Sequence, residues 1–143
     1  MVAALIAGLA GCARPVAVSV PTPTDPATHS TCTALVAALP RTVGDQPVAD
    51  RTPESPLTAA WGDPAIVARC GVPVPSALTP TSQLVTVNGV GWLAERAGDG
   101  YRFTTVGRAA NLEVTVPGAY APEADALVGL ALVIRTEDPH VID

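Results

Sequence analysis

The sequence predicts an α+β domain, in which an antiparallel sheet of about five or six strands carries two helices, one N-terminal and one C-terminal, on one face. Two observations lead to this fold class. A segment with helical periodicity stands at each end of residues 31–136, and short apolar or alternating segments separated by turn residues fill the region between them. The chain has 143 residues and 48% hydrophobic content, which suits a single domain with a sizeable core.

The strongest strand signal lies in residues 57–75, LTAAWGDPAIVARCGVPVP. Two apolar runs, residues 59–61 and 65–70, flank Gly62-Asp63-Pro64, and Gly and Pro between β-prone runs predict a hairpin. Side chains alternate along a strand, so Ile66, Ala68 and Cys70 share the apolar face and Arg69 points to the other. The Val-Pro-Val-Pro run at 72–75 ends the strand, because proline has no N–H to donate.

Residues 1–11 are predicted to be a lipoprotein signal peptide. The apolar run at 2–10 ends in Leu9-Ala10-Gly11-Cys12, which resembles a bacterial lipobox with Cys12 as the lipidated residue. The run stops at Arg14, far short of the roughly 20 apolar residues that a membrane-spanning helix needs. No positive charge precedes it, so a truncated ordinary signal or a buried apolar segment is the alternative.

Residues 12–30 are predicted to form a Pro/Thr-rich tether, since four prolines fall in residues 13–30 and no helix or strand period persists. In polyproline conformation, at about 3.1 Å per residue, this segment could hold the domain up to roughly 55 Å from a membrane. His29 lies in it, where a solvated residue is the simpler interpretation than a ligand.

The first helix is predicted over residues 31–39, capped by Ser30 or Thr31 and ended by Pro40. Cys32 lies on its apolar face, at i, i+3, i+4 and i+7 spacing with three aliphatic residues. If Cys12 carries lipid, Cys32 and Cys70 remain as an even pair outside the cytoplasm, where disulfides persist. The alternatives are two buried free thiols or a metal site, and the sequence spaces no third or fourth ligand for a metal.

The rest of the sheet is predicted from turn residues. Asn88-Gly89 favours a two-residue hairpin between residues 84–87 and 90–93, with a glycine bulge in one strand as the alternative. Asp99-Gly100 predicts the next turn, and residues 112–116 alternate as a half-buried antiparallel strand. A short strand is placed at Thr42–Val43 within an otherwise irregular loop.

A second helix is predicted to open at Pro122 and to run to Arg135, with acidic residues in its first turn and a basic one in its last. It is apolar on most sides, so it should be buried against the sheet. The tail at 137–143, which contains His140, is predicted to be frayed.

These segments together resemble one known family. The order AAWGDPAIVARCGVP (59–73), VNGVGWL (87–93), YRFTTVGR (101–108) and VTVPGAYAP (114–122) is similar to the actinobacterial secreted or lipid-anchored family called domain of unknown function 3515. The resemblance covers about residues 31–135. It implies a cell-envelope protein with no assigned activity, so it supplies no catalytic residue.

Charge and residue types exclude several function classes. The net charge is -5, all eight basic residues are arginine, and no basic patch is visible, which argues against nucleic acid as a partner. Both histidines lie outside the predicted elements, which argues against a Ser-His or Cys-His site. Four acids in the sheet region are better explained as turn or solvent-facing residues than as a glycosidase pair, namely Asp63, Glu95, Asp99 and Glu113. No cofactor motif is found, because the glycines of VNGVGW lack a following helix.

Two function classes remain. The favoured one is a noncatalytic envelope lipoprotein that binds or scaffolds an envelope protein or ligand, anchored to the membrane through its N-terminal lipid. Its expected contact surface is an edge strand or the turn near Trp61 and Asp63, with Trp92 as a further candidate. The alternative is a carrier of a small apolar ligand, with Trp61 or Trp92 lining a pocket between helix and sheet. Both tryptophans could instead fill the core.

Overall fold

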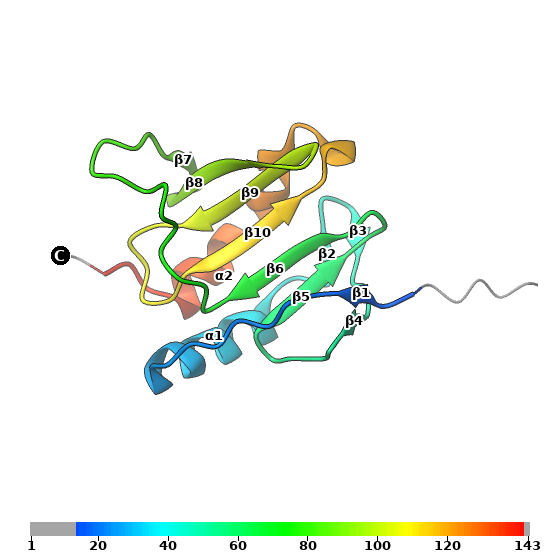
Figure 1. The fold of residues 1–143 in the computed structure, drawn as a ribbon, viewed down its shortest axis with the longest axis horizontal. Helices are drawn as coiled ribbons and strands as arrows, with labels where there is room; N and C mark the ends of the chain where they lie inside the picture. The colour runs from blue at the N-terminus through cyan, green and yellow to red at the C-terminus, as the bar shows by residue number, and fades with distance from the viewer. Residues whose placement is uncertain (1–13, 142–143) are drawn as a thin grey trace, which may run out of the picture.

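A six-stranded antiparallel sheet forms the centre of the computed structural model, which describes residues 14–141. The strand order is β5-β6-β10-β9-β8-β7, and every neighbouring pair is antiparallel. Figure 1 shows the sheet with the first and the last described residues at opposite ends of the molecule. The α+β prediction is confirmed. The strands are β5 (Thr58–Trp61), β6 (Ile66–Cys70), β7 (Val85–Val87), β8 (Val90–Ala97), β9 (Gly100–Thr105) and β10 (Leu112–Val116).

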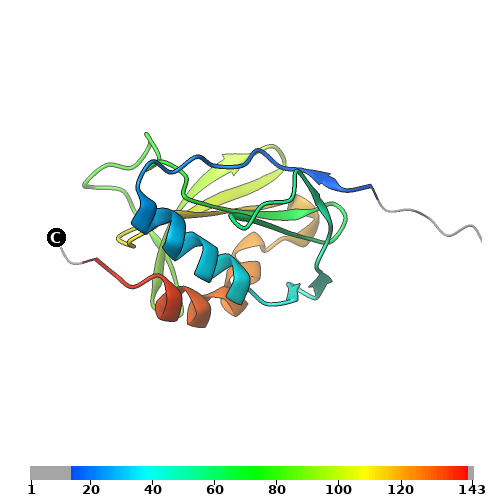
Figure 2. The same ribbon diagram turned by 90° about the horizontal axis from the view of Figure 1, so that it is seen from below.

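The helices all lie on one face of the sheet, as Figure 2 shows. The β7–β8 hairpin forms at the predicted turn, with Asn88 and Gly89 at φ 48° and 83°, a region that favours these two residues. The β8–β9 turn is Gly98-Asp99, one residue earlier than the predicted Asp99-Gly100, because Gly100 already pairs with Ala97. Two small pairs complete the fold: β1 (Val16–Ala17) lies parallel to β4 (Arg51–Thr52), and β2 (Thr42–Val43) lies antiparallel to β3 (Gln46–Pro47). The helical elements are α1 (Pro26–Ala38), the 3-10 helices η1 (Gly118–Tyr120) and η2 (Glu123–Leu130), and α2 (Ala131–Glu137).

The core lies between the sheet and the helices. Both tryptophans are in it, with exposed fractions of 1% for Trp61 and 0% for Trp92. The Trp61 indole N–H donates to the Pro40 carbonyl at 2.9 Å, which satisfies its polar atom inside the core. Aliphatic side chains of the strands and of η2 and α2 fill the remaining space, including Ile66, Leu112, Val114, Leu127, Leu130 and Ile134.

The disulfide between Cys32 and Cys70 is formed, with Cα atoms 5.4 Å apart. Both residues are fully buried, on the apolar faces that periodicity predicted. The bond joins α1 to the end of β6 and closes a loop whose ends are 38 residues apart. In the chain-entropy account, a loop of that length constrains the unfolded state by about 4 kcal/mol.

The N-terminal part of the domain differs from the prediction. Helix α1 begins at Pro26 rather than at residue 31, and Asp25 caps it by accepting from the Ala27 and Thr28 N–H groups at 3.2 and 3.3 Å. An Asp-Pro pair at these positions is a strong start signal, because Pro suits the first helical turn. The rest of the predicted tether, from Val16 on, runs over the sheet face opposite the helices before it enters α1 (Figure 2).

The C-terminal part also differs. The predicted second helix divides into the 3-10 helix η2 and the α-helix α2, so only its second half has α-helical geometry. The tail is packed up to residue 141, not frayed: Asp138 is fully buried and His140 pairs with Arg108 in an isolated β-bridge. Backbone bonds fix it, since the Val141 N–H donates to the Gly107 carbonyl at 2.8 Å.

Candidate functional site

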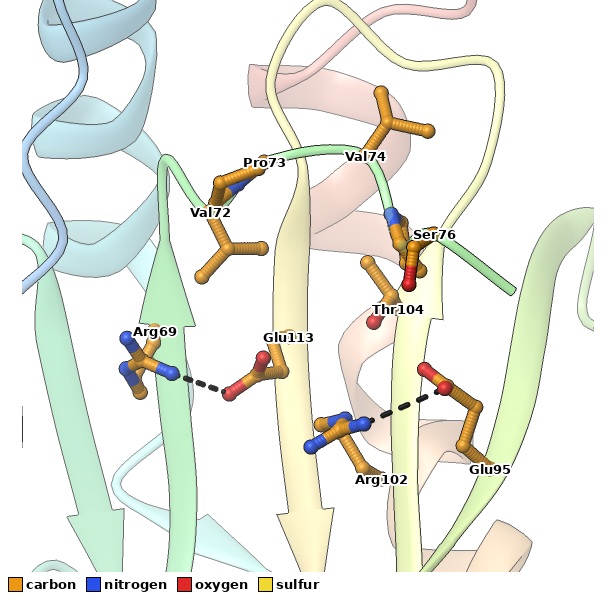
Figure 3. A pocket seen from close by; sticks show the side chains of 10 residues that line it. Arg69, Val72, Pro73, Val74, Ser76, Glu95, Arg102, Thr104 and Glu113 are labelled. Atoms are coloured by element: carbon orange, nitrogen blue, oxygen red, sulfur yellow. Dashed lines mark hydrogen bonds and ion pairs between the residues drawn. The ribbon is translucent and has the colours of Figure 1, made fainter. Parts of the chain in front are cut away.

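The outer face of the sheet carries a hollow of about 360 Å³ lined by charged side chains. The topology explains its position. Strands β6 and β7 are separated by three other strands, so the connection at residues 71–84 must cross the sheet. Its first part forms one wall of the hollow, as Figure 3 shows. The lining includes Arg69, Val74, Glu95, Arg102, Thr104 and Glu113.

Two ion pairs span neighbouring strands across this face (Figure 3). Arg69 Nη1 lies 2.9 Å from Glu113 Oε1, and the two residues are direct partners in the β6–β10 register. Arg102 Nη2 lies 3.3 Å from Glu95 Oε2, and these two are partners in the β8–β9 register. Directly opposed side chains of unlike charge stabilise a sheet, so the register itself places the four charges in the hollow.

Arg69 and Arg102 differ in how many of their N–H groups already have a partner in the described part of the protein. Arg69 also donates from Nε to the Ser19 carbonyl at 2.8 Å, which ties the N-terminal segment to the sheet. Arg102 has the single ion pair with Glu95 among the described residues, and 41% of its side chain is exposed. A guanidinium carries five N–H donors. Arg102 is therefore the side chain of the hollow with the most unused hydrogen-bonding capacity.

The wall formed by residues 72–76 is fixed at its start by Asn111 of the neighbouring segment. The Asn111 side-chain amide donates to the Val72 carbonyl at 3.1 Å, and the Gly71 N–H donates to the Asn111 carbonyl at 3.0 Å. This segment covers Thr104, which is 1% exposed although it points away from the helices. Val74 extends outward instead and is 63% exposed. The hollow thus presents an apolar side chain beside a charged floor.

The chemistry of the hollow favours recognition over catalysis. Glu95 and Glu113 do come together in it, but each already lies beside an arginine on the same open face. An acid and base pair needs two carboxylates in different environments. Neither histidine lines the hollow, and within residues 14–141 no group of three His, Cys, Asp or Glu side chains is placed to hold a metal ion.

A second hollow, of about 670 Å³, lies at the end of the molecule where the described chain begins. It is bounded by Arg14, β1, β3 and the β5–β6 turn, and Asp63 lines it as an exposed residue. Val48, at 53% exposed, adds an apolar side chain. Asp63 is therefore the one member of the predicted contact surface that is accessible.

Trp61 and Trp92, the other two members of the predicted contact surface, are buried in the core, so the prediction that they lie on a contact surface is wrong. Neither tryptophan lines the hollows found in the described part of the chain, and the pocket expected for an apolar-ligand carrier is therefore not seen there. Their burial follows from their positions on the helix-facing side of β5 and β8. Cys12 lies outside the described residues.

The burial of one charged residue, Asp138, was not predicted from the sequence. Asp138 accepts the Ala110 N–H at Oδ1 at 2.9 Å, while its Oδ2 is buried without a hydrogen-bond partner. Burial raises the pKa of this carboxyl from 3.8 to about 6, although the Ala110 N–H and the nearby Arg108 charge oppose the shift. No periodicity marks a single buried aspartate in a polar tail, so the sequence offered no signal for it.

In residues 14–141, no helix combines the length and the apolar character that crossing a bilayer requires. Comparison with curated proteins gives no significant match, and comparison with solved structures gives none either. A family described as protein of unknown function (DUF3515) does match, over residues 1–141. That range covers the sheet, the disulfide, both hollows and the packed tail. The chain therefore belongs to the DUF3515 family.

Proposed function

We propose that the protein is a cell-envelope lipoprotein that works outside the cytoplasm as a noncatalytic binding module. Cys12, at the end of Leu9-Ala10-Gly11-Cys12, is the proposed lipid attachment site. The Cys32–Cys70 disulfide supports this location, because such bonds persist mainly outside the cytoplasm. The partner is another envelope protein rather than a substrate.

The observation that carries the binding role is the hollow on the outer sheet face. Its floor offers Arg102 donors and glutamate oxygens, and Val74 stands exposed at its edge. Interfaces commonly combine an apolar anchor with arginine and a charged rim. The fixed register of β8, β9 and β10 holds these groups in place, so a partner meets a preformed surface.

Site-specific photocrosslinking tests the binding role. A photoreactive residue at position 74 is expected to give a discrete crosslinked band in envelope membranes, and Arg102→Glu is expected to abolish the band because it turns a donor into a repelling charge. A photoreactive residue at position 141, where Val141 is 49% exposed, serves as control. A band at position 74 that is indifferent to Arg102→Glu would contradict the role of the hollow.

The lipoprotein assignment has its own test. The protein is expected in the membrane fraction, and Cys12→Ala or treatment with globomycin should leave it soluble or unprocessed. Cys12→Ala does not touch the described domain, so its unfolding transition should be unchanged. Mature, membrane-bound protein in both cases would show that Cys12 carries no lipid.

A further inference from the structure

The N-terminal segment that looks like a tether is largely fixed to the domain. The Val16 N–H donates to the Asp50 carbonyl at 2.8 Å, and the Val18 N–H donates to the Thr52 carbonyl at 3.1 Å. Val18 is 6% exposed, and Ser19 is held by Arg69. Residues 16–19 are therefore fixed to the domain by backbone hydrogen bonds and by the burial of Val18.

The fixed segment sets how far the domain can stand from a lipid on Cys12. Val16 follows Cys12 by four residue steps along the chain. A fully extended chain spans at most about 3.6 Å per residue, so this linker reaches about 14 Å. A free tether of eighteen residues would have allowed roughly 55 Å. This step rests on the lipidation of Cys12 that is part of the proposed function.

We propose that the bilayer surface is the partner of the end of the molecule that holds Arg14, residues 46–50 and the β5–β6 turn. These residues line the hollow of about 670 Å³, and they lie together at the end of the molecule where the described chain begins (Figure 1). The short linker of about 14 Å holds this end of the domain near the bilayer, and no electrostatic attraction between the protein and the lipid headgroups is needed. Arg14 suits lipid phosphate, but the lining includes Asp50 and Asp63, so its formal charge is one minus two, or -1.

The proposal orients the whole domain. The connection at 71–84 and the C-terminal segment lie at the opposite end from β1 in Figure 1, so they face away from the membrane. Val48 is exposed near the proposed contact, and Gln83 is exposed at the far end. These two positions form a matched pair for a distance measurement.

Headgroup quenching tests this orientation. Val48→Cys and Gln83→Cys are made in the full chain and labelled with the same fluorophore, since Cys32 and Cys70 are oxidised and buried. The acylated proteins are placed in phosphatidylcholine vesicles that contain lipids with a nitroxide on the headgroup. Quenching is expected to be about threefold or more stronger at position 48, because a linker of about 14 Å holds that end near the headgroups. Equal quenching at the two positions would overturn the proposal.

Two further measurements separate the inference from the proposed function. A flexible Gly/Ser insertion of 12 residues between Ala13 and Arg14 gives a linker with a root-mean-square reach of about 20 Å or more, and it should bring the two quenching values together. If the chain proves not to be acylated, the lipoprotein function fails. The Cys12 thiol is then coupled to a maleimide lipid in the same vesicles, where stronger quenching at position 48 supports the geometry and equal quenching refutes it.

Discussion

Asp138→Asn is the variant for which the structure gives the most definite expectation. The carboxyl is fully buried, and Oδ1 accepts the Ala110 N–H at 2.9 Å. Asparagine keeps an oxygen for that bond and removes the charge that burial penalises. The titratable and charged groups of the surrounding segments are Arg108, whose Nη1 donates to the Asp138 carbonyl at 3.3 Å, and His140, whose side chain packs at Gly107.

The direction in which pH changes the free energy of unfolding follows from the native and unfolded pKa values of the Asp138 carboxyl. Burial raises the native pKa to about 6, against 3.8 for the unfolded chain. Between these values the native state binds more protons than the unfolded state, so this group lowers the free energy of unfolding as the pH rises. A difference of about two pKa units corresponds to about 3 kcal/mol. That penalty is absent below about pH 4 and complete above about pH 6.

We therefore expect Asp138→Asn to match the wild type in stability near pH 4 and to exceed it by up to about 3 kcal/mol at pH 7. Denaturant unfolding of both proteins from pH 3.5 to 7.5 measures the difference at each pH. Other titrating groups cancel in that difference. A difference for Asp138→Asn that stays flat across this pH range would refute the reasoning.

Three further variants test the packing that places the outer-face hollow. Replacing both Cys32 and Cys70 by alanine should lower the free energy of unfolding by about 4 kcal/mol in the chain-entropy account, and an unchanged denaturation midpoint would speak against a bond that constrains the unfolded chain. Gly71→Ala should cost about 1–3 kcal/mol, because Gly71 has φ 93° and a Cβ there would lie 3.0 Å from Pro23 Cγ. Thermal unfolding measures this cost. A near-neutral result is expected instead for Gly129→Ala, because a Cβ there meets open space and the φ of Gly129 is not positive. Arg69→Met should lower the free energy of unfolding by about 1–3 kcal/mol, because it leaves Glu113 half-buried without its cation. It should also speed proteolysis of residues 14–25, which Arg69 ties to the sheet. Arg135→Met, at an exposed arginine, is the control, and equal cleavage rates in the two variants would contradict the role of Arg69.

The sheet was predictable because its signals are local. Asn88-Gly89 fixes a turn through backbone geometry, and residues 112–116 alternate in step with the strand period. The Asp99-Gly100 signal located the β8–β9 hairpin to within one residue, since the turn itself is Gly98-Asp99. The faces of Cys32 and Cys70 followed from the same periodicities. These elements present the predicted faces to the core because one face of each is buried.

The outer face was not predictable from the same signals. Proline-rich segments at 16–25 and 72–76 have no period, so the sequence did not indicate that they fold back over the sheet. The ion pairs of the hollow depend on which strands are neighbours, and β10 lies between β6 and β9 only through a connection that crosses the sheet. The sequence leaves two places open for Trp61 and Trp92, a contact surface or the core, and the structure has both in the core.

The Cys32–Cys70 bond also determines how the molecule responds to a pull on its N-terminus. Tension on Val16 loads first the two-residue pairing of β1 with β4, then the segment up to Cys32. Beyond that residue the load passes through the disulfide into β6, an inner strand of the six-stranded sheet. Peeling therefore releases at most the 16 residues that precede Cys32 from Val16 on, about 55 Å of extended chain, while the sheet keeps its strands. The N-terminal segment can act as a length reserve that ends at a covalent stop.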